Sequence, residues 1–124
     1  MPGYQTTGSI TALYQGDSIM FWNGENPAVG SSSLQAALGP AIGTTGQSGS
    51  VQIVFAGAPG AFEIDVQTSD TDVASDYVSK TQITTVDSNN VARAEISPLV
   101  AKFWRLSLVS LTNAVAITAT GTIG

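Results

Sequence analysis

The apolar and polar residues of this chain alternate in the pattern of β-strands. Two runs stand out, V-Q-I-V-F at residues 51–55 and F-E-I-D-V-Q-T-S at residues 62–69. Because successive side chains of a strand point to opposite faces, each run has one apolar face and one largely polar face. Between the runs, Pro59 presets φ for a turn and Gly60 can take the positive φ of a type II turn.

The two runs are predicted to pair as a β-hairpin that organises the rest of the fold. A slip of one residue would turn the large apolar side chains of one strand to solvent, so the register should be well specified. The register places three apolar pairs on one face: Phe55 with Phe62, Ile53 with Ile64, and Val51 with Val66.

The same alternation predicts further strands along the chain. They cover residues 9–15, 18–22, 77–86, 91–96, 102–111 and 114–120. The run 102–111 is the strongest, and the face that carries Trp104, Leu106 and Leu108 is predicted to be core. Lys80 is typical of an edge strand, since a charged side chain protects an edge from aggregation.

Two stretches lack the alternation. Residues 1–8 are broken by proline and glycine, and are predicted to be an extended arm, either frayed or lying on a neighbouring subunit. Residues 23–50 are rich in turn-forming residues and are predicted to be a long loop that crosses a surface or reaches a partner. Within that loop, Ser33 could cap a short helix over residues 34–38.

Seven or eight short strands with almost no helix predict an all-β fold, an antiparallel β-sandwich. A jelly roll or an immunoglobulin-like sandwich fits best, and the pattern leaves the strand order open. A chain of 124 residues suits one domain and can bury about two-thirds of its unfolded surface without a disulfide or a metal. The predicted organisation is a single domain over residues 1–124, with the main strand run at 51–124.

The composition excludes several kinds of chemistry. The chain has no histidine and no cysteine, so Ser-His-Asp catalysis, Cys-His catalysis, thiolate zinc sites and disulfides are all ruled out. Charged residues are 10% of the chain, against about 25% in ordinary soluble domains, and the net charge is −5. Nucleic acid is therefore not expected as a partner, because phosphate binding needs clustered Lys and Arg.

Neither a membrane span nor a secretory signal is predicted. No segment has the roughly 20 apolar residues that a bilayer-spanning helix needs. The first residues lack a basic region followed by an apolar core. We therefore expect the chain to fold in the cytoplasm, where it is made, and to have no membrane partner.

Two groups of carboxylates are candidates for chemistry. Asp70, Asp72 and Asp76 are spaced like the start of a calcium loop, but the following residues do not match an EF-hand. They are interpreted as Asx-type turns, with a calcium site of another kind left open. Glu63 and Asp65 could act as a hydrolase pair, but they alternate with core residues and are interpreted as a solvated sheet face. No catalytic residue, metal or cofactor is predicted, and the chain is not expected to be an enzyme.

Three runs in the second half resemble a known class of proteins: G-A-P-G-A-F-E-I-D-V-Q-T-S-D-T-D, A-K-F-W-R-L-S-L-V-S-L and N-A-V-A-I-T-A-T-G. They look like small β-sandwich proteins of tailed-bacteriophage virions, in particular the jelly-roll-like capsid decoration (cement) proteins. The resemblance covers roughly residues 50–121. It implies a homo-oligomer, most often a trimer, bound to the major capsid protein on the outer capsid surface of a virion assembled in the host cytoplasm. It implies no catalysis, and it carries over no catalytic or metal residues.

The first hypothesis is therefore a structural virion protein that decorates and stabilises a capsid. A low-charge surface rich in small hydroxyl residues suits many weak contacts that add up over identical copies. Phe21 and Trp22 are consecutive, so one is expected in the core and the other in an interface. The residues predicted to contact the partner are Tyr4, Tyr14, Phe21, Trp22, Pro27, Val29 and Leu34.

The alternative hypothesis is a carbohydrate- or receptor-binding module of a phage tail or fibre. Sugar binding favours an exposed aromatic side chain beside polar residues. Trp22, next to Asn23 and Glu25, is the best candidate for such a site.

Overall fold

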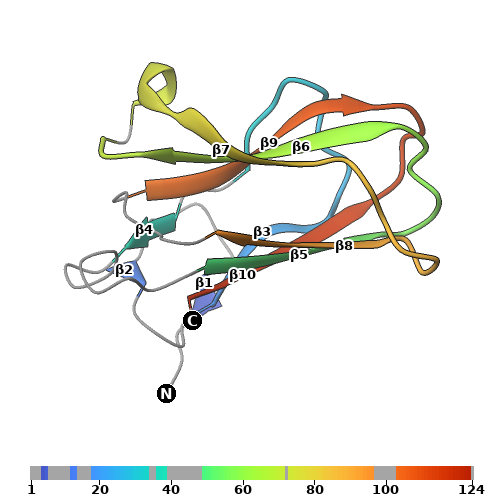
Figure 1. The fold of residues 1–124 in the computed structure, drawn as a ribbon, viewed down its shortest axis with the longest axis horizontal. Coiled ribbons are helices and arrows are strands. Elements are labelled where there is room, and N and C mark those ends of the chain that lie inside the picture. The colour runs from blue at the N-terminus through green and yellow to red at the C-terminus, as the bar shows by residue number, and fades with distance from the viewer. Residues whose placement is uncertain are drawn as a thin grey trace.

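The computed structural model describes residues 4–5, 12–13, 18–33, 36–38, 49–71, 73–96 and 103–123. They form two five-stranded sheets that pack face to face (Figure 1). In spatial order, sheet A contains β1 (Tyr4–Gln5), β3 (Ser18–Glu25), β10 (Ile117–Ile123), β5 (Gly49–Phe55) and β8 (Val91–Ile96). Sheet B contains β2 (Ala12–Leu13), β4 (Ala36–Leu38), β9 (Phe103–Leu111), β6 (Phe62–Ser69) and β7 (Val78–Ile83). The predicted all-β sandwich is confirmed.

The strand pairing is that of a jelly roll rather than an immunoglobulin-like sandwich. Antiparallel partners are nested along the chain: β6 with β7, β5 with β8, β4 with β9, and β3 with β10. The chain from β3 to β10 is thus one long antiparallel ribbon, folded back on itself between β6 and β7 and then rolled up. Rolling places successive segments of the ribbon in alternate sheets, as in jelly rolls.

The predicted hairpin between β5 and β6 is wrong. β5 lies between β10 and β8 in sheet A, and β6 lies between β9 and β7 in sheet B. Residues 56–61 form an arch that carries the chain from one sheet to the other (Figure 1). Phe55 and Phe62 do touch, with ring centroids 4.8 Å apart, but they come from opposite sheets. Two strands whose apolar faces oppose each other show the same alternation as two strands side by side, so the pattern could not separate the two arrangements.

The arch is held by the turn between β9 and β10 rather than by pairing of its own flanking strands. Gly60 follows Pro59 with a φ of 68°, as the turn chemistry predicts. The backbone N–H of Asn113 donates to the carbonyl of Pro59 at 3.0 Å, and that of Thr112 donates to Ala61 at 2.9 Å. The arch and the turn after β9 therefore form one hydrogen-bonded end of the sandwich.

The core is built from the inward faces that the alternation predicts. Trp104, Leu106 and Leu108 of β9 are fully buried, which confirms the predicted core face of that run. The predicted edge strand is also confirmed, because β7 is the outermost strand of sheet B and Lys80 on it is exposed. A register shift between β6 and β7 leaves Lys80 without a direct partner, and such bulges discourage edge-to-edge pairing.

Phe21 and Trp22 are both buried, so the expectation that one of them would lie in an exposed interface is wrong. The pairing of β3 with β10 slips at this point. Met20 lies opposite Thr120 and Trp22 opposite Ala119, which leaves Phe21 without a partner. A bulge of this kind re-aims a side chain, and here it accompanies two consecutive aromatic residues that both enter the core.

Gly121 makes room for the aromatic pair at the centre of the core. The rings of Phe21 and Trp104 meet edge to face, with centroids 5.0 Å apart and an interplanar angle of 88°. A Cβ atom on Gly121 would lie 2.6 Å from Cε2 of Phe21 and 2.8 Å from Cη2 of Trp104. Both distances are shorter than van der Waals contact, so a side chain at position 121 would displace the rings.

Part of the predicted long loop at residues 23–50 belongs to the sheets, while residues 34–35 and 39–48 lie outside the described residues. Residues 23–25 extend β3, and residues 49–50 begin β5. Residues 36–38 form β4, so the predicted helix over residues 34–38 is wrong at these three positions. The physical reason is the open edge of β9: its unpaired backbone groups favour an extended neighbour and override the local helix preference.

Residues 30–33 run along the same edge of β9 and are fixed by backbone hydrogen bonds. The N–H of Gly30 donates to the carbonyl of Leu108 at 2.7 Å, and the N–H of Ser33 donates to Leu106 at 2.8 Å. The buried Oγ of Ser33 accepts the N–H of Leu106 at 2.9 Å, so this side chain continues the ladder instead of capping a helix.

Of the predicted N-terminal arm, Tyr4 and Gln5 are described. They form β1, which pairs in parallel with Ser18 and Ile19 of the same chain. The remainder of residues 1–8 lies outside the described residues.

Replacing Gly121 with alanine is expected to lower the free energy of unfolding by about 1–3 kcal/mol. The added methyl group overpacks the contact between Phe21 and Trp104 and forces side chains out of their preferred rotamers. Equilibrium unfolding in urea measures the loss as a lower midpoint at an unchanged m-value.

Gly57 is the matched control for this substitution. A Cβ atom there would lie 3.5 Å from Cγ1 of Val115, which is ordinary contact, and the backbone is not in the left-handed region. Gly57→Ala is expected to stay within about 0.5 kcal/mol of the parent chain. Equal losses in the two variants would contradict this description of the core.

Candidate functional site

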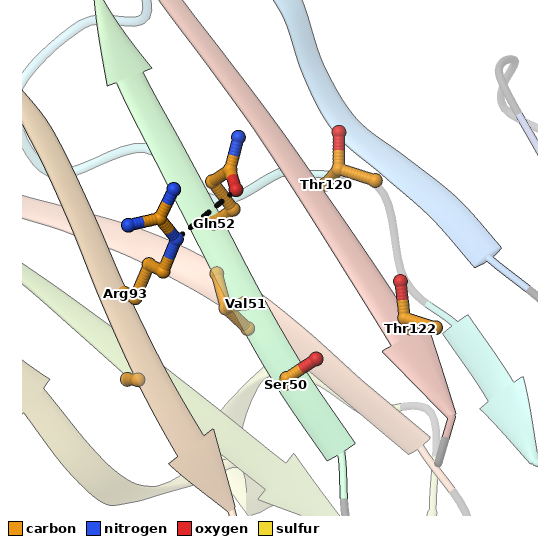
Figure 2. Close-up of a pocket in the computed structure, with 7 residues that line it drawn as sticks. Ser50, Val51, Gln52, Arg93, Thr120 and Thr122 are labelled. Carbon is orange, nitrogen blue, oxygen red and sulfur yellow. Dashed lines mark hydrogen bonds between the residues drawn. The ribbon is translucent and has the colours of Figure 1, made fainter.

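The outer face of sheet A carries an open hollow lined mainly by hydrogen-bonding side chains (Figure 2). It lies over β10, β5 and β8 and has a volume of about 370 Å³. The residues that line it are Ser50, Val51, Gln52, Arg93, Ala94, Thr120 and Thr122.

Cross-strand register brings the polar residues of the hollow together. Thr120 lies opposite Gln52, and Gln52 lies opposite Arg93, so one row crosses three strands. Thr122 lies opposite Ser50 in the next polar row. The residues between them on each strand point into the core, so the alternation that fills the core also builds this polar face.

The side chains of Arg93 and Gln52 fix each other across the hollow. Nε of Arg93 donates to Oε1 of Gln52 at 3.2 Å, as Figure 2 shows. This bond occupies the acceptor of the Gln52 amide and leaves its NH₂ group as a donor. Arg93 also retains the four N–H groups of its two terminal nitrogens. Glu95 lies on the same face of β8, opposite Ser50, and is exposed.

A second polar site lies on the outer face of sheet B, at Asp65. Asp65 lies opposite Gln82 of β7 and Ser107 of β9, and the residue is 6% exposed. The Oγ of Ser79 donates to its Oδ2 at 2.7 Å, while no N–H group or hydroxyl of the described residues donates to the buried Oδ1. The interpretation of Glu63 and Asp65 as a solvated sheet face is therefore wrong at Asp65, which is buried, whereas Glu63 is half-buried.

Glu63 lies two residues before Asp65 on the same face of β6 and interacts with it. A hydrogen bond between the two carboxyl groups raises the pKa of Glu63, and partial desolvation and the charge of Asp65 raise it further. A protonated Glu63 can donate to Asp65, whereas two ionised carboxylates would repel each other.

Of the aspartates after β6, Asp76 takes part in a local hydrogen bond. The Oγ1 of Thr71 donates to Oδ2 of Asp76 at 2.6 Å, next to the 3₁₀ turn Ala74–Asp76. Asp72 lies outside the described residues. In the part of the chain that the structure describes, no three acidic side chains gather where they could hold a metal ion.

Of the residues predicted to contact a partner, two remain available on the surface. Val29 is 58% exposed and Pro27 is half-buried. Val29 precedes Gly30, whose N–H binds the carbonyl of Leu108, and Val109 next to Leu108 is 42% exposed. The bulge between β6 and β9 falls at Val109. Val29 and Val109, both exposed, are thus the chain neighbours of Gly30 and Leu108, whose backbones are hydrogen-bonded to each other at the edge of sheet B.

Two of the other predicted contact residues, Phe21 and Trp22, are buried in the core. Trp22 is 3% exposed, so it cannot serve as the aromatic platform of a sugar site beside Asn23 and Glu25. Phe21 is equally buried. Tyr4 belongs to β1, while Tyr14 and Leu34 lie outside the described residues.

Sequence analysis missed the hollow on sheet A. Each of its polar residues stands on the polar side of an alternating run, which is the signal that the sequence contains. The signal becomes a site only once β10 is known to lie beside β5, and β5 beside β8. The incorrect hairpin placed β5 beside β6 and so separated Gln52 from Thr120 and Arg93.

A scan of the chain against models of known protein families finds no match, and a search among curated proteins finds no relative. The jelly-roll topology and the two outer faces are therefore the basis for any functional conclusion. The described residues contain no helix that is long and apolar enough to cross a membrane.

Glu63→Gln is expected to remove a pH dependence of stability. Because the folded state raises the pKa of Glu63, it binds the proton more tightly than the unfolded state does. The stabilisation that comes from the proton is complete below pH 4.5, the ordinary pKa of this group, and is lost as the pH rises through the raised value. The glutamine side chain of the variant still donates a hydrogen bond, but it does not titrate. Denaturant unfolding across acid to neutral pH should show the parent chain losing stability relative to the variant as the pH rises.

Asp87→Asn serves as the contrasting variant, because here the stability of the parent chain relative to the variant should rise with pH rather than fall. Oδ1 of Asp87 accepts the N–H groups of Val91 at 3.0 Å and Asn89 at 2.8 Å, and these bonds lower its pKa, as does the charge of Arg93. The advantage of the parent chain over this variant should be present at neutral pH and be lost as the pH falls through the lowered pKa. The same slope in both variants would contradict the two assignments.

Proposed function

We propose that this chain is a structural protein of a virion, which decorates and stabilises a bacteriophage capsid by binding the major capsid protein from outside. The observation that carries the proposal is the nested strand pairing of a jelly roll, an architecture common in viral capsid domains. The resemblance of roughly residues 50–121 to capsid decoration proteins points the same way.

The composition supports a binding role over chemistry. With no histidine or cysteine and few charges, the chain offers little for catalysis and much for static contact. A capsid presents the same site many times, so a contact that is weak in each copy stabilises the whole lattice. The buried aromatic and aliphatic side chains of both sheets form one core, which suits a static binding role.

The exposed valines at the edge of sheet B are the best-supported position for the contact. Val29 and Val109 adjoin the bonded pair of Gly30 and Leu108, so their backbone is fixed before any partner binds. A preformed surface loses less conformational entropy on association than a loose loop does. Burial of these side chains against the capsid protein removes apolar surface from water.

Val29→Asp is expected to weaken capsid binding by about tenfold or more, which corresponds to about 1.4 kcal/mol. The assay is co-sedimentation of the purified chain with shells of the major capsid protein from the same genome. A charge at this position must be desolvated in the interface, which opposes binding.

The matched control is Val78→Asp on the edge strand β7, where the valine is 64% exposed. This variant should bind as the parent does. Failure of the parent chain to bind shells would contradict the function. An equal loss in the two variants would contradict the position of the contact.

A homo-oligomer, with three copies as the expected number, is part of the proposal. Sedimentation equilibrium of the purified chain should then give three times the 12.7 kDa of one chain. A single-chain mass at all concentrations, both alone and on the shell, would contradict this part.

A further inference from the structure

The hollow on sheet A offers mostly hydrogen-bond donors. Oε1 of Gln52 is occupied by Arg93, so Gln52 presents its NH₂ group and Arg93 presents its terminal nitrogens. Within the described ranges, this bond to Gln52 is the hydrogen bond that the Arg93 side chain makes. Asp87 acts on Arg93 through charge alone. A ligand that fits this chemistry supplies acceptors, and a carboxylate matches the planar fork of an arginine.

The rest of the hollow suits hydroxyl groups. Ser50, Thr120 and Thr122 each carry a hydroxyl that both donates and accepts, and Figure 2 shows them on the same face as Gln52 and Arg93. The hydroxyl of Thr122 shares one hydrogen bond with the hydroxyl of Ser18 at 3.3 Å and keeps its remaining capacity for a ligand. Glu95, opposite Ser50 on the same face, can accept hydrogen bonds, and its charge opposes each anionic group that binds nearby, so it disfavours a polyanion most. The hollow therefore favours a molecule with one carboxylate and several hydroxyls over a polyanion.

Among the described residues that line the hollow, none has an aromatic side chain. A neutral sugar would lack the stacking platform that usually anchors it, so hydrogen bonds alone would hold it. A negatively charged group on the ligand, in contact with Arg93, would supply the affinity that stacking does not. The volume of about 370 Å³ is at the lower end for small-molecule sites, which suits one or two sugar rings.

We propose that the outer face of sheet A binds an acidic saccharide, with the sugar carboxylate on Arg93 and the ring hydroxyls on Gln52, Ser50, Thr120 and Thr122. This site is separate from the proposed capsid contact, which lies at the edge of sheet B. On a decorated particle the hollow would be present in many copies, so a weak single site gives a strong total attachment to a glycan surface.

The test is a titration of the ¹⁵N-labelled full chain, followed by NMR, with methyl glucuronide, methyl glucoside and acetate in parallel. The expected result is saturable shifts at residues 50–52, 93–94 and 120–122 with the glucuronide. Its Kd should be about tenfold or more below those of the other two probes, because neither has both the charge and the hydroxyls. No saturable shift at the hollow with the glucuronide would overturn the proposal, as would equal binding of acetate.

Variants separate the contacts of the site from the fold. Arg93→Gln removes the charge at an exposed position and is expected to raise the Kd for the glucuronide about tenfold or more. Thr120→Val keeps the shape and removes one hydroxyl, and is expected to raise the Kd about threefold or more. Lys80→Gln on β7, in the other sheet, should leave the Kd unchanged. Parent-like spectra away from the substitution confirm folding, and an unchanged Kd in Arg93→Gln would overturn the proposal.

Discussion

The contact of Phe21 and Trp104 over Gly121 is the constraint on which the rest of the structure depends. It joins β3 and β10, which are the two ends of the rolled ribbon, to β9 of the opposite sheet. Phe21 lies on the inward face that alternation from Ile19 predicts, and the bulge brings Trp22 to the same face. The missing side chain at position 121 leaves space for the ring of Phe21. A jelly roll is complete only when its first and last strands pair, and in this chain the aromatic contact lies directly beneath that pair.

The outer faces of the two sheets depend on how the strands around this aromatic contact are oriented. With Ile117, Ala119 and Gly121 of β10 turned inward, Thr118, Thr120 and Thr122 must point outward. The hollow over sheet A is thus the reverse side of the strand that closes the core. On sheet B, β9 pairs with β6 on one side and with residues 30–33 and β4 on the other, which fixes the exposed valines at that edge. One rigid body therefore carries two separate surfaces, one apolar and one rich in donors.

The sequence was sufficient for the strands and their inward faces, because burial imposes a period of two that residues such as Trp104, Leu106 and Leu108 display directly. It was insufficient for the strand order. β5 and β6 alternate in the same way whether they lie side by side or face each other across the core. Phe21 and Trp22 were misjudged because a bulge breaks the alternation without a sequence signal. The hollow was missed because Gln52, Arg93 and Thr120 become neighbours only through long-range pairing.

The most direct test of the central claim is a nuclear Overhauser measurement on Gly121. If the roll is closed by the aromatic pair, the α protons of Gly121 will show cross-peaks to the rings of both Phe21 and Trp104. They will also be shifted far from random-coil values by the ring currents. Random-coil shifts at Gly121, with no cross-peaks to either ring, would contradict the account.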